Sequence, residues 1–291
     1  MSNLSIVVLA PPLDPKSAGI VVLHRLYHAL KNIDQKTQLL PYKGISNQFL
    51  VATASDEWVE PERLSELFID SIFIVPEVLC ASRLVGLRVA RYYLNKLGAI
   101  APAVANTADE FAIAWSPEFC SEPFFYLFDY VGKAPLPVNF ESTQTKSRPI
   151  NITYFGKNAA NYKETFPMPT SILFTRSWPE TTEHYLELMS MANYLFTFDC
   201  VSSTNVDALA LGVKVVILDF YPHTENSFKD KLSVNQPYLT AENYENEQAI
   251  MLYAEKYEKW LSDSRKDQAN FGSNTKVLYN SIKQFFTNQS K

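Results

Sequence analysis

Runs of residues typical of β-strands alternate with helical patterns through almost the whole chain. The first run covers residues 4–9, and apolar residues then recur at helical spacing over residues 20–31. The same reasoning predicts strands at residues 71–75, 111–115 and 124–128, and a long helix at residues 82–97. Such alternation is typical of an α/β fold with mostly parallel sheets.

A proline-rich polar stretch, residues 133–149, interrupts this alternation and resembles a linker between domains. The alternation then resumes. Strands are expected at residues 150–155, 171–175, 194–198 and 213–218, and helices at residues 182–192 and 203–211. From residue 244 the chain is expected to be mainly helical, with a break near Gly272. We therefore predict two domains, residues 1–145 and 146–272.

Charge and cysteine usage exclude several classes of protein. The formal net charge is -5, whereas general nucleic-acid binders are usually basic. Cys80, Cys120 and Cys200 are widely spaced, which fits neither a zinc site nor a disulfide framework. The N-terminus lacks the basic start and apolar segment of a signal peptide, and polar residues interrupt the most apolar region, residues 194–220. We expect a soluble, cytoplasmic protein.

Polar residues follow the four strands expected in the second half of the chain. They are Gly156 with Lys157, Arg176, Asp199 and Asp219. In open α/β sheets, ligands bind beyond the carboxyl ends of the strands. The set therefore predicts a binding site at this edge of the sheet, although Asp219 reads equally well as an ordinary turn residue.

The segment that begins at Asp199 combines a cluster of hydroxyl and amide side chains with the start of a helix. The cluster is Ser202, Ser203, Thr204 and Asn205. A helix that starts here would direct amide groups and its positive dipole end at a phosphate, and Lys157 and Arg176 would add charge for a diphosphate. Asp207 could accept hydrogen bonds from ribose hydroxyls. Alternatively, Ser203 only caps the helix and Asp207 only complements its dipole, and both readings stay open.

These residues resemble the retaining GT-B glycosyltransferases. The C-terminal domain of that family has a Glu-x7-Glu motif, followed by Ala, a small residue, Gly and a Val-rich strand. Here the pattern reads Asp199-x7-Asp207, followed by Ala208, Ala210, Gly212 and residues 213–217. Both acids are Asp, whose shorter side chain reaches less far. Residues 154–157 resemble the family's first C-domain strand with its phosphate-contacting loop.

The N-terminal half carries weaker parts of the resemblance. Residues 17–20 resemble the small-residue loop after the first strand, which makes Gly19 a donor-binding candidate. Residues 75–77, taken with residues 88–94, resemble a pattern found in bacterial surface-polysaccharide transferases. Glu77 and His24 are acceptor-side candidates. His24 and His28 have the spacing of zinc-binding helices but lack the following Glu, so we expect surface or helix-packing histidines. His24 could still face the cleft, because its helix begins at Gly19.

The resemblance implies the GT-B fold, with two Rossmann-like domains that face a central cleft. It also implies that a C-terminal helix, residues 273–291, crosses back to the N-terminal domain. That helix has an apolar face suited to this role: Val277, Leu278, Ile282, Phe285 and Phe286. Asp199 would contact the donor sugar as the catalytic residue, and Asp207 would contact the ribose. The remaining donor-binding residues would be Gly19, Gly156, Lys157, Arg176, Ser202, Ser203, Thr204 and Asn205.

The implied function is a hexosyltransferase-like glycosyltransferase. It would move a sugar from a nucleotide-sugar donor to a glycan or glycolipid acceptor in bacterial polysaccharide biosynthesis (lipopolysaccharide, O-antigen or capsule), with retention of configuration. No metal or other cofactor is expected, because protein cations would neutralise the leaving group. A sugar-nucleotide epimerase of GT-B architecture and a non-catalytic nucleotide- or carbohydrate-binding module remain alternatives.

Expectations about other partners follow from charge. No nucleic acid partner is expected. Basic residues from Lys256 onward could make peripheral contact with an anionic membrane at its inner face, or could form a solvated helix face.

Overall fold

The chain forms two compact units, each with its own β-sheet. The computed structural model describes residues 4–53, 57–101, 109–121, 123–130, 132–138, 143, 148–157, 171–221 and 223–289. Unit 1 comprises Met1–Asp129 and Asp267–Lys291, and unit 2 comprises Tyr130–Lys266. The expected α/β fold class is confirmed by the two sheets and the helices that connect their strands.

Unit 1 is built on an eight-stranded sheet. Its strands are β1 (Ser5–Ala10), β2 (Gln38–Lys43), β3 (Leu50–Ala52), β4 (Trp58–Val59), β5 (Ser71–Pro76), β6 (Arg88–Tyr93), β7 (Phe111–Ala114) and β8 (Phe125–Tyr126). They follow the spatial order β4-β3-β2-β1-β5-β6-β7-β8. The pairs from β2 through β8 are parallel, whereas β3 and β4 add antiparallel. The chain therefore reverses its winding direction at β1, between its neighbours β2 and β5.

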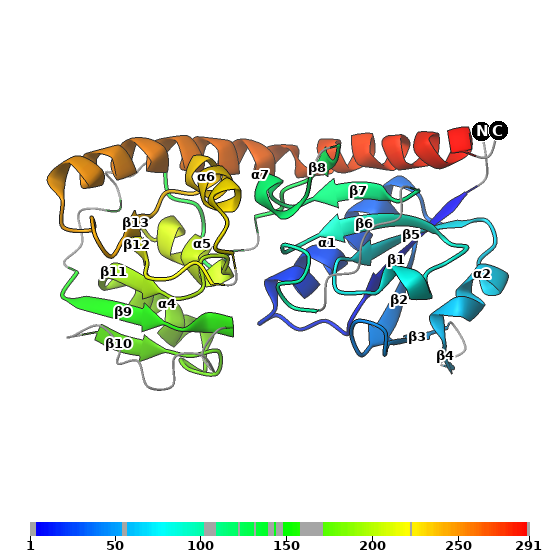
Figure 1. The fold of residues 1–291 in the computed structure, drawn as a ribbon, viewed down its shortest axis with the longest axis horizontal. Coiled ribbons are helices and arrows are strands. Elements are labelled where there is room, and N and C mark those ends of the chain that lie inside the picture. Colours follow the sequence, from blue (N-terminus) through cyan, green and yellow to red (C-terminus); the bar gives the residue numbers. More distant parts are fainter. Residues whose placement is uncertain are drawn as a thin grey trace. The chain divides into compact units, whose positions relative to one another are not determined.

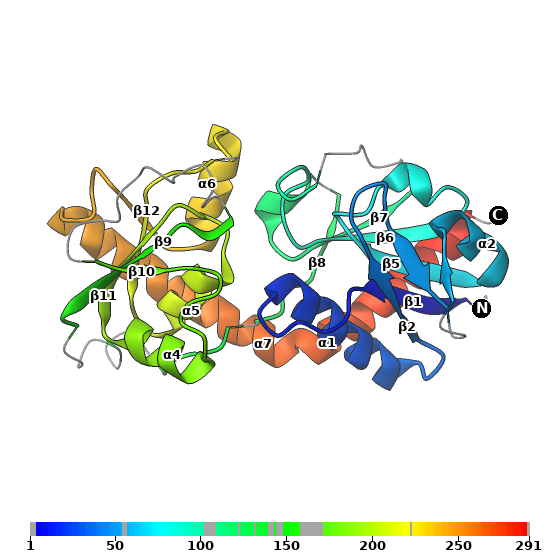
Figure 2. The same cartoon turned by 90° about the horizontal axis from the view of Figure 1, so that it is seen from below.

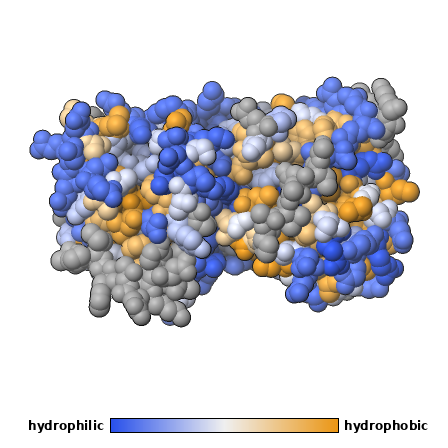
Figure 3. Space-filling model, viewed as in Figure 1, coloured by the Kyte–Doolittle hydropathy of each residue, from blue (hydrophilic) through white to orange (hydrophobic). Residues whose placement is uncertain are grey.

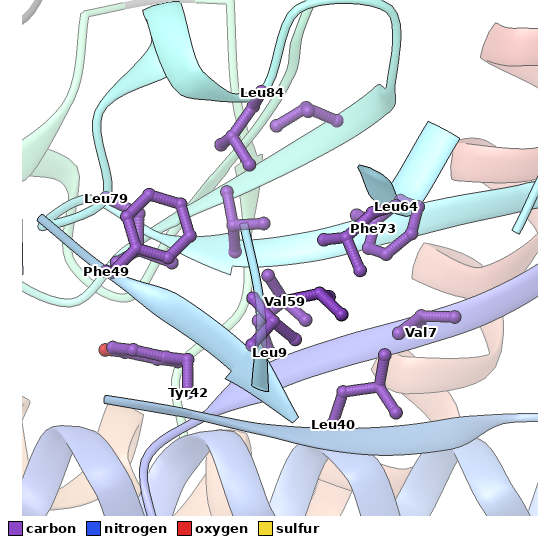
Figure 4. Packing of buried hydrophobic residues seen from close by; sticks show 13 residues of the cluster. Val7, Leu9, Leu40, Tyr42, Phe49, Val59, Leu64, Phe73, Leu79 and Leu84 are labelled. Carbon is purple, nitrogen blue, oxygen red and sulfur yellow. The ribbon is translucent and has the colours of Figure 1, made fainter. Parts of the chain in front are cut away.

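The core of unit 1 includes a cluster that β1, β2, β3 and β5 build together (Figure 4). Val7 and Leu9 contribute from β1, and Phe73 and Val75 from β5; all four are fully buried. The outer residues Phe49 and Leu64 close the cluster from the loop before β3 and from the short helix α2 (Leu64–Leu67). Burial on both faces of β1 and β5 explains why these two strands read as continuous apolar runs in the sequence.

Two long helices pack in unit 1. Helix α1 (Ala18–Ile33) buries Val22, Leu23, Leu26 and Leu30, which recur at helical spacing. The last helix, α7 (Glu247–Gln289), enters unit 1 from Asp267 onward. There the Tyr279 hydroxyl donates to Asp34 at 2.8 Å, and Phe285 packs edge-on against Phe111. The C-terminal helix thus packs on the N-terminal unit, as expected, and Figures 1 and 2 show its red end beside α1 and β7.

The helix predicted at residues 82–97 is wrong. A 3-10 turn at Ala81–Arg83 leads instead into strand β6, which lies between β5 and β7. The residues of β6 after Arg88 are buried, so the segment is a short strand buried on both faces, a pattern that periodicity alone does not separate from a buried helix. Within it, Arg91 is buried and forms an ion pair with Glu110 at 2.7 Å.

Unit 2 is built on a five-stranded parallel sheet. Its strands are β9 (Ile150–Tyr154), β10 (Ser171–Phe174), β11 (Ala192–Thr197), β12 (Lys214–Ile217) and β13 (Leu239–Thr240). They follow the spatial order β10-β9-β11-β12-β13, with every pair parallel. The winding direction reverses at β9, which lies between β10 and β11. Helices of the unit that the structure describes include α4 (Thr182–Ser190), α5 (Ser203–Ala210), α6 (Asn226–Asn235) and the first part of α7.

Helix α7 continues through Gly272, so the predicted break there is wrong. Buried residues anchor the helix on both sides of the glycine: the Tyr257 hydroxyl donates to the Leu209 carbonyl at 2.7 Å, and Leu278 is fully buried. A glycine inside a helix costs only about 1 kcal/mol, which such packing outweighs.

On the face seen in Figure 3 the surface is mostly hydrophilic, with apolar residues among the polar ones. Within the described ranges, none of the helices combines the length and apolar character that a membrane span needs.

The chain passes from unit 1 into unit 2 between Asp129 and Tyr130, and returns between Lys266 and Asp267. Residues 133–138, 143, 148 and 149 of the predicted linker belong to unit 2. Residues 139–142 and 144–147 of that linker lie outside the described residues.

Candidate functional site

The candidate site of unit 2 lies where the winding of its sheet reverses. Strands β9 and β11 are neighbours, and their carboxyl ends lead into the loops that carry Gly156 and Asp199. Connections that leave two adjacent strands in opposite directions leave space between the loops, and ligands of open α/β sheets bind there. The sheet order therefore places the predicted residues at the position where such folds bind ligands.

The loop after β9 closes tightly around Asp199. Gly156 has a left-handed backbone with φ 61°, and a Cβ atom at this position would overlap with the Cβ and Oδ2 atoms of Asp199. The Lys157 amide donates to Asp199 Oδ2 at 3.1 Å, and the Lys157 ammonium lies 3.4 Å from the Val201 carbonyl. A glycine is thus required for the loop to approach the carboxylate.

Asp199 is a buried carboxylate beside two exposed cations. Its exposed fraction is 6%, and burial raises its pKa, an effect that the charges of Lys157 and Arg176 and nearby amides oppose. Lys157 and Arg176 themselves are exposed. The structure therefore brings together three of the predicted donor-site residues as one carboxylate and two cations.

Helix α5 begins beside Asp199. Ser202 is the N-cap residue, and its hydroxyl accepts from the Thr204 amide at 3.1 Å. Asn205 is fully buried, and its side-chain amide donates to the carbonyls of Asp199 and Cys200 at 3.0 and 3.1 Å. Asn205 thus fixes the turn between the strand and the helix, while Ser202 and Ser203 stay half-buried at its surface.

Tyr154 is part of this site although the sequence analysis did not select it. Its hydroxyl lies beside the side chains of Ser202 and Thr204. Burial and the neighbouring charge of Asp199 raise its pKa. The signal available in the sequence was its position as the last residue of the strand that precedes Gly156.

Asp207 lies on the same helix but points to other partners. It is fully buried, Oδ1 accepts from the Lys133 amide at 2.6 Å, and Oδ2 accepts from the Tyr185 hydroxyl at 2.9 Å. Burial raises the pKa of Asp207, and the amide and charge of Lys133 and the Tyr185 hydroxyl oppose that rise. Contact with a ribose would require the carboxylate to leave these partners. Sequence reasoning missed both Lys133 and Tyr185, which are far from Asp207 in the chain.

The predicted residues of the N-terminal half lie in unit 1, near the point where its own sheet reverses. His24 Nε2 is 2.8 Å from the Pro11 carbonyl, directly after β1. Glu77, directly after β5, is buried and accepts from the Leu94 amide at 3.1 Å. Gly19 lies in the first turn of α1, where an added Cβ would be 3.6 Å from the Leu94 side chain. The structure thus gathers His24 and Glu77 at the carboxyl edge of β1 and β5.

Unit 1 also contains a buried carboxylate that the sequence analysis missed. Asp129 is fully buried and lies 2.9 Å from the Arg25 guanidinium. Neither of its oxygens accepts a hydrogen bond among the described residues, so the contact is an ion pair alone. Burial raises its pKa to about 6, against the effect of Arg25.

Among the residues that the structure describes, no three His, Cys, Asp or Glu residues cluster as metal ligands would.

Comparisons with known proteins give likeness in structure only. No protein-family model matches the chain, and neither does any curated protein. Similar solved structures include the spinosyn rhamnosyltransferase SpnG, at 12% identity over 96% of both chains with a TM-score of 0.44. Another is the glycosyltransferase SnogD from Streptomyces nogalater, at 12% identity over 96% of this chain and 99% of that one, with a TM-score of 0.47. The glycosyltransferase SsfS6 from Streptomyces sp. SF2575 matches at 10% identity over 93% and 96%, with a TM-score of 0.44.

Proposed function

We propose that the chain is a glycosyltransferase that binds its nucleotide-sugar donor in unit 2, at the carboxyl ends of β9 and β11. The observation that carries the proposal is the buried Asp199, which the Gly156–Lys157 backbone encloses beside the exposed cations Lys157 and Arg176. A nucleotide sugar presents both of the groups that such a site suits, a diphosphate and a set of sugar hydroxyls.

The two cations would stabilise the leaving group. As the bond between the sugar and the diphosphate breaks, negative charge develops on the diphosphate, and fixed cations at that position lower the barrier. Lys157 and Arg176 also supply charge-assisted hydrogen bonds to the phosphate oxygens. Half-buried hydroxyls at the start of α5, those of Ser202 and Ser203, add polar contacts. On this basis the reaction proceeds without a metal.

Asp199 would hold the donor sugar. Its Oδ2 already accepts one amide hydrogen bond, and the remaining lone pairs of the carboxylate can accept from sugar hydroxyls. We further propose that the acceptor is a glycan or glycolipid of bacterial polysaccharide biosynthesis, and that configuration is retained. The enzyme would work in the cytoplasm, with peripheral membrane contact through the basic C-terminal stretch. His24, Glu77 and Gly19 remain predicted contacts to substrate from unit 1, and these finer assignments rest on the sequence resemblance.

A binding screen tests the donor site directly. Purified protein is titrated with UDP, GDP, dTDP and CMP sugars in a thermal-shift assay, with and without EDTA. Lys157→Ala and Arg176→Ala should each weaken binding of the best ligand by about 1.5–3 kcal/mol, as expected for a charge-assisted hydrogen bond. Lys259→Ala is the matched control, because Lys259 is an exposed cation paired with Asp263 on α7. Unchanged affinity in both site variants, or loss of binding in EDTA, contradicts the proposal.

Product analysis separates the two other activities. A transferase releases nucleoside diphosphate only when an acceptor is present, whereas an epimerase converts the donor without one. A non-catalytic module binds the nucleotide tightly and turns over no donor.

A further inference from the structure

Asp207 has two protein partners that lie far from it in the sequence. Its carboxylate accepts the Lys133 amide and the Tyr185 hydroxyl, at 2.6 and 2.9 Å. The side chain is fully buried, so these partners take the place of solvent. Hydrogen bonds to a buried charge are stronger than ordinary ones, and removing one leaves an unsatisfied charge.

Lys133 belongs to the segment through which the chain enters unit 2. That unit begins at Tyr130, and the Tyr130 hydroxyl donates to the Ala134 carbonyl at 2.5 Å. A Cβ at Gly132 would overlap with the Tyr130 ring and hydroxyl. The Lys133 ammonium lies 4.1 Å from the centre of the Tyr185 ring, within range of a cation–π interaction. This entry segment, Tyr130 with Gly132–Ala134, is therefore folded closely on itself and attached to α4 and α5.

The attachment continues to the candidate donor site. The Tyr185 hydroxyl, which donates to Asp207, also lies beside the Thr204 side chain. Thr204 in turn lies beside the Tyr154 hydroxyl, which also neighbours Ser202. The entry segment is thus connected to the first turn of α5 through the hydrogen bonds of Asp207 and the close packing of Tyr185 on Thr204.

We propose that Asp207 is a positioning residue that fastens the entry segment to the donor-binding helix, and that a nucleoside diphosphate at the start of α5 strengthens this attachment. Only the second part rests on the proposed function, because it needs the ligand. Binding that orders the first turn of α5 stabilises the hydrogen bonds downstream of it, and the coupling is reciprocal: a loosened entry segment weakens binding of the diphosphate. The ribose contact predicted for Asp207 is the competing assignment.

Amide hydrogen exchange tests the attachment without any ligand. In the full chain, Tyr185→Phe removes the bond to Oδ2. Asp207→Asn removes the negative charge instead: its amide oxygen can still accept from the Lys133 amide, and its NH2 group can only donate to the Tyr185 oxygen. Exchange at the Lys133 amide should accelerate about tenfold in either variant, because each variant weakens the charge-assisted hydrogen bonding at residue 207 that holds the entry segment. The double variant should accelerate it no further. Tyr194→Phe is the control, because it removes a different tyrosine bond of unit 2, to the Tyr244 carbonyl.

Ligand binding then separates positioning from ribose contact. Inorganic pyrophosphate has no ribose, so a positioning role predicts that Asp207→Asn weakens pyrophosphate and UDP or GDP by the same factor. In the wild-type protein these ligands should slow exchange at Lys133. A loss confined to the nucleoside diphosphates overturns the proposal in favour of a ribose contact, and unchanged exchange in both variants overturns the attachment itself. If the wild-type protein binds none of the ligands, the proposed function fails, while the exchange of the free protein still decides the role of Asp207.

Discussion

Replacing Asp129 with asparagine should make unit 1 more stable at neutral pH than it is in the wild-type protein. Asp129 is fully buried, its only described ionic partner is Arg25, and burial raises its pKa from an ordinary 3.8 to about 6. The nearby Tyr92 is itself buried, with a pKa that burial and the charge of Asp129 raise. The charged form of Asp129 is therefore disfavoured in the folded state relative to the unfolded chain.

The sign follows from proton binding. Between pH 3.8 and about 6 the folded protein binds more protons at Asp129 than the unfolded chain does, so rising pH lowers stability across this window. The full contribution of Asp129 to the free energy of unfolding is present below pH 3.8 and is lost above about pH 6. The difference between the two pKa values corresponds to about 3 kcal/mol. About 2 kcal/mol of this falls between roughly pH 4.5 and 7.5.

Urea unfolding of wild-type and Asp129→Asn protein, at several pH values and followed by tryptophan fluorescence, measures this effect. Trp115 is a local reporter, because its indole donates to the Asp129 carbonyl at 3.1 Å. The difference between the two proteins is the informative quantity, because Asp199 and Asp207 in unit 2 also have raised pKa values. The stability of Asp129→Asn relative to the wild type should increase as pH rises. The control Asp70→Asn, at an exposed aspartate, should show no such increase. A difference that does not change with pH, or that favours the wild type at high pH, refutes the reasoning.

Three further substitutions follow from the fold and the site. Gly156→Ala should destabilise unit 2 by more than the ~1 kcal/mol cost of a left-handed alanine, because the new Cβ also overlaps with Asp199. The control is Gly86→Ala, at a position with φ 84° and no atom within 4 Å of the new Cβ. In denaturant unfolding this control measures the backbone cost alone. Gly272→Ala should raise the free energy of unfolding by about 1 kcal/mol, and an unchanged melting temperature would argue against a continuous α7. Asp199→Asn should keep its affinity for bare nucleotide in calorimetry and lose turnover of the donor. Equal loss of affinity for the bare nucleotide and for the intact donor would show that Asp199 does not act through the sugar.

Much of unit 2 could be predicted because its strands are short and bounded by polar residues. Strands β9 and β12 were expected at nearly their observed positions, since each apolar run ends at a turn signal. In unit 1 the same reasoning failed at β6. Its run from Arg88 to Tyr93 includes Arg91, a residue type that is usually exposed. The ion pair with Glu110 and a hydrogen bond to the Leu79 carbonyl at 2.7 Å explain its burial. Pairing partners of that kind come from tertiary structure, which periodicity does not report.

The two aspartates of the motif show where prediction of a site ends. Asp199 lies two residues after the end of β11, so the sheet topology sets its place at the switch point beside β9. Asp207 lies one turn inside a helix, and its direction depends on which neighbour covers that face of α5. The neighbours are Tyr185 on α4 and Lys133 in the entry segment, and neither is marked in the sequence by spacing or composition. The spacing of the two aspartates in the motif thus gives the position of each carboxylate along the backbone. The partners that decide the role of each carboxylate come from distant parts of the chain.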